Sequence, residues 1–407
     1  MKKNTIILFV LILIFSNCMS LYALQENRIL NQLGRSVLLL IALIVSMYNN
    51  KYPRTKIVKF GYLLMFWQLL SMLGAYIVRG QGIIDSFITT CYALIYLMIP
   101  LMYIMKIDEK FLLKMCLVIG VWFAFTELIQ QFTYPVYWFA ARGETEEHNI
   151  EIRNGVYRFS VGGTGFGLIT LFYALQKYLE KGKFKYLLLL IVGMVGIYLT
   201  CTRQVMAAAA GCILVGLYLK KKLKLRALIG IAIVGIIVYQ NIDRFFGGYI
   251  EMTEGLDENY IRFIAYRYYG LEYNEGNILA FLIGNGVPRL ERSSYGNEIY
   301  VLQEDLGLIR ADIGLVGEYS FHGILYVITI LYIFWYIFKN RKYIDLYLQL
   351  YMLYSFVTSI MLLPFRCSLG TYSTCIVLYL IDRSMTRNKK IVQEQKSRRR
   401  GLSEKRI

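Results

Sequence analysis

The chain of 407 residues is 57% hydrophobic and only 18% charged, and its mean hydropathy is +0.48. Soluble domains are about 45–50% apolar and about 25% charged, so a soluble chain of this composition could not cover its own surface. Five prolines and the lack of a long polar run exclude a disordered or linker-rich chain. The composition therefore predicts an all-α, polytopic membrane protein, and its net charge of +18 must be distributed between the two sides of the bilayer.

Apolar runs long enough to cross a membrane recur along the chain. A bilayer core about 30 Å thick needs about 20 helical residues at about 1.5 Å each. Lys2 and Lys3 precede the first run, as they would in a cleaved signal peptide, but no small-x-small cleavage site follows, so we interpret this run as a span. Twelve spans are predicted, and the ninth and the last are short: about 5–24, 30–48, 58–78, 84–105, 111–129, 161–179, 185–201, 204–219, 227–241, 310–338, 343–363 and 368–381.

Basic residues alternate between the loops that join these spans. Cytoplasmic loops collect Lys and Arg, so both termini are predicted to lie inside. Every lysine falls on or next to this side, and residues 382–407 form a basic cytoplasmic tail with some affinity for anionic lipid. The bilayer is therefore an expected partner, and nucleic acid is not. The inner loops carry Lys51, Arg54, Lys56, Lys106, Lys110, Lys181, Lys183, Lys220, Lys221, Lys222, Lys224, Arg226, Lys339, Arg341 and Lys342.

The opposite side carries arginine without lysine. Basic residues, including lysine, are preferentially kept in cytoplasmic loops during membrane insertion, and this explains part of the pattern. A guanidinium also forks onto phosphate through two hydrogen bonds and stays charged in a low dielectric, so these side chains fit a lipid pyrophosphate at the outer leaflet. The set is Arg28, Arg35, Arg79, Arg142, Arg153, Arg158, Arg203, Arg244, Arg262, Arg267, Arg289, Arg292, Arg310 and Arg366.

Two outer segments are longer than simple connections. Residues 130–160 form a polar loop, and residues 242–309 far exceed the usual 2–8 residues between helices. The second segment is rich in aromatic and aliphatic side chains and is expected to fold against the helices. The chain is thus divided into nine helices in residues 1–241, an outer loop in 242–309, three helices in 310–381 and the tail.

Within the outer loop, a four-residue spacing predicts a short amphipathic helix. Tyr260, Ile264 and Tyr268 carry this spacing. Arg262 and Arg267 are five residues apart and would point about 140° from each other, at about 100° per residue. They are not expected to reach one ligand together.

Two arginines stand at predicted outer helix ends. Arg158 precedes Gly162 and Gly163, whose flexible backbone can approach a ligand. Arg203 lies in a tight turn, and the small residues 207–211 that follow permit close helix packing. A charge in such a crowded pocket is costly unless it is paired or functional, so Arg203 is predicted to bind a ligand or to form a structural ion pair.

A third motif combines Gly284-Asn285-Gly286 with Arg310 and Asp312, ahead of Gly314 and the tenth span. Gly-Asn-Gly alone more often marks a turn than a site. Asp312 suits a helix start, where the dipole favours an acid, and the simplest interpretation is that Arg310 pairs with it.

No sequence signature of a cofactor or metal is present. The chain lacks a Walker loop, HExxH, CxxC and GxSxG, and its two histidines and seven scattered cysteines do not form a usual zinc site. Most cysteines lie within spans as small packing residues. Cys201 and Cys367 lie at outer helix ends, where a disulfide would bring Arg203 and Arg366 together, although two unrelated thiols are the simpler interpretation.

The order of these features resembles the O-antigen polymerase and O-antigen ligase superfamily. The resemblance rests on the Arg-then-Gly motif at 157–163, the Thr-Arg turn at Thr202-Arg203, the large outer loop with its Gly-x-Gly, and the Asp-x-Gly at Asp312 and Gly314. It implies a GT-C-like glycosyltransferase of the bacterial inner membrane that needs no nucleotide sugar, cofactor or metal. Arg158 and Arg203 would bind the pyrophosphate.

The resemblance also distinguishes the two branches of that superfamily. The ligase branch has a histidine in the large loop after its Gly-x-Gly. Here His148 lies in the earlier loop and His322 lies inside the tenth span, so the polymerase branch is favoured.

The implied reaction joins two undecaprenyl-pyrophosphate-linked oligosaccharides, with a chain-length regulator and a flippase of the same pathway as further partners. Arginines would stabilise the leaving pyrophosphate, and a base would help to remove the proton of the acceptor hydroxyl. Glu304, Asp305 and Glu318 are candidates for that base, and the sequence does not choose among them. The expected substrate-binding residues are Arg158, Arg203, Arg267, Arg310, Asp312, Gly284 and Gly286.

A ligase and a polysaccharide flippase are the alternatives. A flippase should show an internal repeat with broken helices at matching positions. No such repeat is visible between residues 1–200 and 200–407. Its charged pathway should also lie deep within the spans. Here nearly all charge lies near span ends, and the few exceptions, such as Asp85 and Glu127, do not decide the matter.

Overall fold

The computed structural model describes residues 54–139, 161–220, 261–290, 292–362 and 369–404, together with the short pieces 21, 44, 152–153, 156–159 and 365. The predicted spans 5–24, 30–48 and 227–241 lie outside this part, apart from Leu21 and Ile44. Nearly all of the described chain is helical. Its only two-stranded sheet pairs β1 (Ile152–Arg153) with β2 (Val156–Tyr157) in antiparallel fashion.

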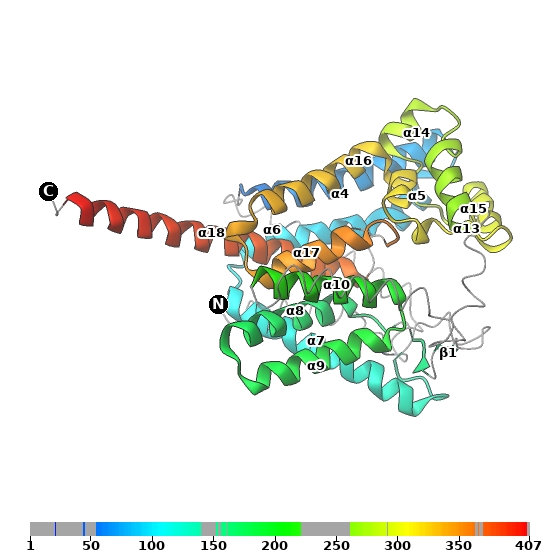
Figure 1. Cartoon of the computed structure of the whole chain (residues 1–407). Coiled ribbons are helices and arrows are strands. Elements are labelled where there is room, and N and C mark those ends of the chain that lie inside the picture. Colours follow the sequence, from blue (N-terminus) through cyan, green and yellow to red (C-terminus); the bar gives the residue numbers. More distant parts are fainter. Residues whose placement is uncertain are drawn as a thin grey trace.

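The longer helices run roughly parallel or antiparallel to one another as a bundle (Figure 1). Each predicted span within the described residues coincides with a helix, although the edges differ by several residues. The first half contains α4 (Lys56–Ile77), α5 (Ile83–Thr90), the 3-10 helix η2 (Cys91–Leu97), α6 (Met98–Ile104), α7 (Glu109–Thr133), α8 (Thr164–Lys181), α9 (Phe184–Leu199) and α10 (Arg203–Leu219).

The second half begins with short helices and ends with long ones. A helix is present at the predicted place as α13, which continues directly into a π-helical turn. Its buried positions are Ala265 and Tyr269, however, whereas Ile264 of the predicted apolar stripe is 41% exposed. The elements are α13 (Ile261–Arg267), the π turn η5 (Tyr268–Glu272), α14 (Ile278–Ile283), α15 (Ser294–Glu304), the 3-10 turn η6 (Arg310–Asp312), α16 (Gly314–Lys339), the 3-10 turn η7 (Arg341–Tyr343), α17 (Leu346–Thr358) and α18 (Leu369–Glu404).

Four described segments are long and apolar enough to cross a membrane: α4, the succession from α5 to α6, α7 and α16. The helices α9 and α10 are apolar but shorter, with 16 and 17 residues. The chain is therefore a helical membrane protein.

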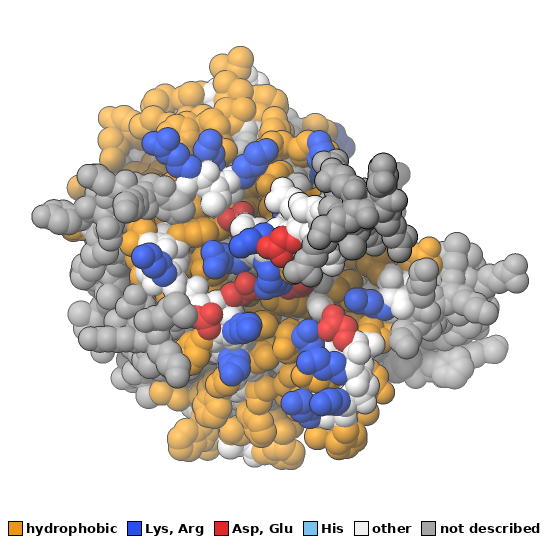
Figure 2. Space-filling view, turned by 90° about the vertical axis from the view of Figure 1, so that its left-hand side faces the viewer, with side chains coloured by type: hydrophobic (Ala, Val, Ile, Leu, Met, Phe, Trp, Pro, Cys, Tyr) orange, Lys and Arg blue, Asp and Glu red, His pale blue; other side chains and the backbone are white. Residues whose placement is uncertain are grey.

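The two ends of the bundle differ in character. The short elements of residues 261–313 gather at one end, which we call the loop end, and α18 leaves the bundle at the other (Figure 1). Lys and Arg side chains gather on that second face, which we call the basic end (Figure 2). The chain order explains this, because the helix ends that carry Lys56, Lys106, Lys181 and Lys339 all lie there. The predicted segregation of lysine to one side is thus present in the fold.

The helix α10 ends at the basic end, whereas α13 lies at the loop end (Figure 1). The predicted span 227–241 between them lies outside the described residues.

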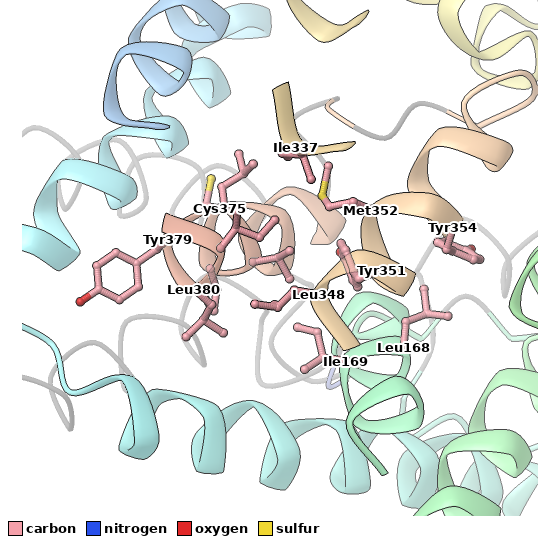
Figure 3. Close-up of a cluster of buried hydrophobic side chains, with 14 of the residues drawn as sticks. Leu168, Ile169, Ile337, Leu348, Tyr351, Met352, Tyr354, Cys375, Tyr379 and Leu380 are labelled. Carbon is pink, nitrogen blue, oxygen red and sulfur yellow. The ribbon is translucent and has the colours of Figure 1, made fainter. Parts of the chain in front are cut away.

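The core lies where α18 passes between α8, α17 and the other helices (Figure 3). Residues 375–381 of α18 are apolar on every face and at most 1% exposed, which is typical of a helix surrounded by others. Leu348 and Met352 of α17 and Ile169 of α8 pack in the same cluster and are completely buried. This packing fixes the helix ends that hold the candidate site.

Candidate functional site

Arg310 lies in a cage of aromatic rings at the loop end. Its side chain is completely buried, and its guanidinium carbon lies 4.3 Å from the ring centre of Phe321 and 5.4 Å from those of Tyr269 and Tyr273. Nη1 donates to the Tyr295 hydroxyl at 3.1 Å, while Nε and Nη2 have no hydrogen-bond partner among the described residues. Arg310 therefore holds the outer elements on α16 and is closed to a large substrate.

The expected pairing of Arg310 with Asp312 is wrong. Asp312 instead lies 3.5 Å from Arg262 of α13, and Arg267 of the same helix binds Glu272 at 2.9 Å. The two arginines of α13 thus have separate acidic partners, as their five-residue spacing predicted. Arg310 is stable in this cage because the faces of four aromatic rings attract a cation that is removed from water.

Arg79, at the end of α4, connects the outer elements to the bundle. Its Nε donates to Asn285 at 2.8 Å, its Nη2 donates to the Tyr273 carbonyl at 2.6 Å, and its Nη1 lies 3.5 Å from Glu298. The guanidinium also lies 4.1 Å from the centre of the Tyr273 ring. Four contacts on three different segments make Arg79 a structural clamp that the sequence did not single out from the other outer arginines.

Burial changes the chemistry of the tyrosines in this cage. It raises the pKa of Tyr269 to about 12, and it raises the pKa of Tyr273 well above its usual value. Both hydroxyls therefore stay protonated at neutral pH, and the Tyr269 hydroxyl donates to the Leu308 carbonyl at 3.0 Å.

The Gly284-Asn285-Gly286 turn packs against a break in α16. Gly323 has φ 80° and ψ 174°, so the helix is interrupted there. The Asn285 and Gly286 amides donate to the Ser320 and Phe321 carbonyls at 3.1 and 2.8 Å. A Cβ on Gly284 would lie 2.3 Å from the Phe321 carbonyl oxygen, so glycine is needed for close packing. Gly284 and Gly286 are structural contacts here.

A buried acid and a histidine lie at the same break. Glu318 is 0% exposed, and its Oε2 lies 3.8 Å from Nε2 of His322, one helical turn away. His322 Nδ1 lies 3.0 Å from the Ser71 hydroxyl, which itself donates to the Gln68 carbonyl. The two ring nitrogens of His322 therefore face different groups, Nδ1 the Ser71 hydroxyl and Nε2 the Glu318 carboxyl group.

The three candidates for the base occupy different environments. Glu304 ends α15, Asp305 follows it, and both are exposed. Glu318 is buried beside His322, where an ionisable group is costly and more often functional. Glu318 is therefore the strongest of the three.

Arg158 and Arg203 belong to the other side of the bundle. Arg158 is exposed and directly follows β2, which the Gln131 side chain of α7 holds by hydrogen bonds to both the amide and the carbonyl of Tyr157. Arg203 is half-buried at the first residue of α10. Neither residue is among the partners that form the Arg310 cage.

An apolar groove extends along α10 from Gln204 to Val215. Its volume is about 510 Å³, and its walls are α10 and α17. Small residues were expected to bring helices together here, but Ala207 and Gly211 are exposed and leave space unfilled. The lining includes Gln204, Ala207, Gly211 and Val215 on α10, and Leu353, Val357, Ile360 and Met361 on or just after α17.

The outer elements reach one end of this groove. The Tyr266 hydroxyl of α13 donates to the carbonyl of Ile360, which lines the groove, and the Leu315 amide donates to the Ser359 carbonyl at 2.8 Å. Arg262 lies one helical turn from Tyr266. The helix α13, which also carries Arg262, therefore contacts the groove at Ile360.

The described residues contain no group of His, Cys, Asp and Glu side chains that could hold a metal ion. Cys201 is buried, and Cys367, the other member of the disulfide considered above, lies outside the described residues.

No known protein family or curated relative explains this arrangement by similarity. No family model matches the chain, and no curated protein matches it significantly.

Proposed function

We propose that this protein is a membrane glycosyltransferase that polymerises oligosaccharide repeat units carried on undecaprenyl pyrophosphate. The observation that carries the proposal is the apolar groove between α10 and α17, whose lining on α10 starts at Gln204, the residue after Arg203. A polyprenyl chain needs an apolar channel, and its diphosphate needs guanidinium groups at the membrane surface. The groove and the arginine supply these two requirements at adjacent positions.

In this proposal the donor glycan leaves one lipid and joins another. The bond from the anomeric carbon to the pyrophosphate oxygen breaks, and the pyrophosphate keeps the bonding electrons. The same carbon bonds to a hydroxyl oxygen of the acceptor sugar, whose proton is released. Arg203, with Arg262 of α13, would stabilise the charge on the leaving pyrophosphate.

The proton acceptor in this scheme is one of Glu304, Asp305 and Glu318. A general base needs to be close to the proton that it removes. Glu318 is buried beside His322 in α16, whereas Glu304 and Asp305 are exposed at the end of α15. Which of the three reaches the acceptor hydroxyl is decided by substituting each one and measuring polymerisation.

The proposal is tested by deleting the gene and examining surface polysaccharide. Loss of polymer while single repeat units still reach the surface supports a polymerase. Polymer that forms but fails to be attached to its acceptor indicates a ligase.

A chemical test uses the purified protein in liposomes with the lipid-linked repeat unit. Wild-type protein should lengthen the glycan, and Arg203→Lys should lose most of this activity because ammonium cannot fork onto phosphate. Arg341→Lys is the matched control, since Arg341 is exposed in η7 at the basic end of the bundle. Normal polymer length from Arg203→Lys would overturn the assigned role.

A transporter is the second candidate, because α16 is broken at Gly323 beside the buried Glu318 and His322. Broken helices with ionisable side chains are typical of ion-coupled transporters. Repeat units trapped on the inner side of the membrane after deletion would favour this function over the polymerase.

A further inference from the structure

A stretch without charge separates two charged parts of the outer elements. Residues 276–288 contain no Asp, Glu, Lys or Arg, whereas Glu275 precedes them and Arg289 follows them. The stretch contains α14, the Gly284–Gly286 turn and a short return segment. A chain that enters a membrane and leaves on the same side has this pattern, because its charged residues stay at the surface.

The Gly284–Gly286 turn contacts α4 and α16 several residues inward from the loop end of each helix. Gly323, whose Cβ would lie 2.3 Å from the Leu282 carbonyl oxygen, is 16 residues from Lys339 at the basic end. That separation is about 24 Å at about 1.5 Å per residue. Gly74 of α4, whose Cβ would lie 1.9 Å from the Gly284 carbonyl oxygen, is 18 residues from Lys56, or about 27 Å. Both distances are shorter than a bilayer core of about 30 Å, so the turn lies inside it.

The backbone amides of the Gly284–Gly286 turn are hydrogen-bonded to protein groups, as the interior of a membrane requires. The break in α16 provides the Ser320 and Phe321 carbonyls for the amides of Asn285 and Gly286, and the Gly284 amide donates to Ala280. The Asn285 side chain, completely buried, also binds Asn274, Ser320 and Arg79. Non-helical backbone at this depth is tolerated when protein groups satisfy it.

The return segment leads back to charged residues at the loop end. The Val287 carbonyl accepts hydrogen bonds from Gln81 and Thr89, at 3.0 and 2.9 Å. Two residues later, Arg289 forms an ion pair with Asp85 of α5. The chain therefore enters after Glu275, turns at Gly284–Gly286 and leaves at Arg289.

One face of α14 is apolar and exposed. Ile278 is 74% exposed, Phe281 45% and Leu282 36%, while the opposite face packs on α4 and α16. The helix lies at the edge of the molecule beside the ends of these two spans (Figure 1). Its exposed face continues the apolar surface of the spans, which includes Ile328 at 53% exposure.

We infer that residues 277–288 form a re-entrant hairpin in the leaflet at the loop end, and that lipid acyl chains cover the exposed face of α14. Acyl chains are the occupant that the depth of the turn and the chemistry of the exposed face indicate. Residues 276–288 carry no charge, and the Arg79 guanidinium that binds Asn285 is itself held by the Tyr273 carbonyl and Glu298. The hairpin thereby couples the outer elements to the break in α16.

The test is the depth of nitroxide spin labels in liposomes. Ile278→Cys and Phe281→Cys are labelled separately, with Ile328→Cys as the lipid-facing reference and Asn297→Cys, exposed on α15, as the aqueous reference. Unsubstituted protein treated in the same way gives the background from the native cysteines. Oxygen partitions into the acyl region and a water-soluble nickel chelate does not.

At positions 278 and 281, we expect the ratio of oxygen to nickel collisions to resemble that at position 328. A ratio equal to that at position 297 would overturn the hairpin. Gel filtration identifies any variant that fails to fold, and Ile278→Cys keeps the test decisive because that side chain is the most exposed. The result is independent of glycosyltransferase activity.

Discussion

The guanidinium of Arg310 lies 4.3 Å from the centre of the Phe321 ring, in a completely buried site that contains no carboxylate contact among the described residues. Phe321 precedes His322 and the break at Gly323, while Arg310 ends the outer segment. This contact between Arg310 and Phe321 therefore connects the outer elements to the part of α16 that precedes the break.

The aromatic cage predicts how substitutions of Arg310 affect stability. Arg310→Met fills the space and makes sulfur–ring contacts, so we expect a change in unfolding free energy of at most about 1 kcal/mol. Arg310→Ala leaves a cavity among four rings and should cost about 3 kcal/mol. Thermal unfolding of the purified protein measures both. Equal effects of the two variants would contradict a packing role, whereas loss of activity in a stable Arg310→Met variant would show that the charge itself is required.

Alkaline pH should loosen the outer elements. The pKa of Tyr269 is raised by burial to about 12, against about 10 in an unfolded chain. The stability from its protonated form is complete below pH 10 and is lost as the pH rises toward 12. Tyrosinate absorbance and thermal unfolding between pH 9 and 12 report this loss. Tyr269→Phe should weaken the pH dependence in this window; an unchanged slope would exclude Tyr269 as its source.

The glycines of the outer elements allow a matched comparison. Gly284 and Gly276 have similar φ values of 81° and 73°, but a Cβ on Gly284 meets the Phe321 carbonyl at 2.3 Å and one on Gly276 meets nothing within 4 Å. Both alanine variants incur strain of about 1–3 kcal/mol from the positive φ, and Gly284, with ψ 178°, lies in a region essentially restricted to glycine. Only Gly284→Ala should also displace the hairpin, as seen by spin labels at position 278. Equal behaviour of both variants would show that the close approach is unimportant.

Filling the groove should stop polymerisation without unfolding the protein. A Cβ on Gly211 meets nothing within 4 Å, so Gly211→Phe can place its ring in the groove. Gly211→Ala is the control and should stabilise the helix by about 0.5–1 kcal/mol. Polymer-length distributions from cells carrying each variant provide the measurement. Long polymer from a stable Gly211→Phe protein would rule out the groove as the polyprenyl site.

Much of the membrane architecture follows from local sequence. The apolar runs predicted the helices, because a span must satisfy its backbone within itself. The spacing of Ile264 and Tyr268 predicted α13, and the five-residue separation of Arg262 and Arg267 predicted their divergence. The partners of Arg310 and Asp312 were not predictable, because the cage is assembled from residues up to 41 positions away, such as Tyr269.

Several features of the candidate site could not be predicted from the sequence either. The groove depends on how far α10 stands from α17, and small residues at 207 and 211 are compatible with close packing or with an open channel. The break at Gly323 depends on the distant amides of Asn285 and Gly286, which take the carbonyls that the helix leaves free. Glycine alone permits such a break but does not require it.

The sequence by itself determined that this is a helical membrane protein with lysine on one side, because hydropathy, helix length and the sidedness of basic residues are local properties. Tertiary structure alone decided that Arg310 is enclosed, that Glu318 faces His322, and that residues 277–288 descend beside α4 and α16. These outcomes depend on side chains and backbone groups distant in the chain, whose burial and hydrogen bonding are fixed only when the helices pack.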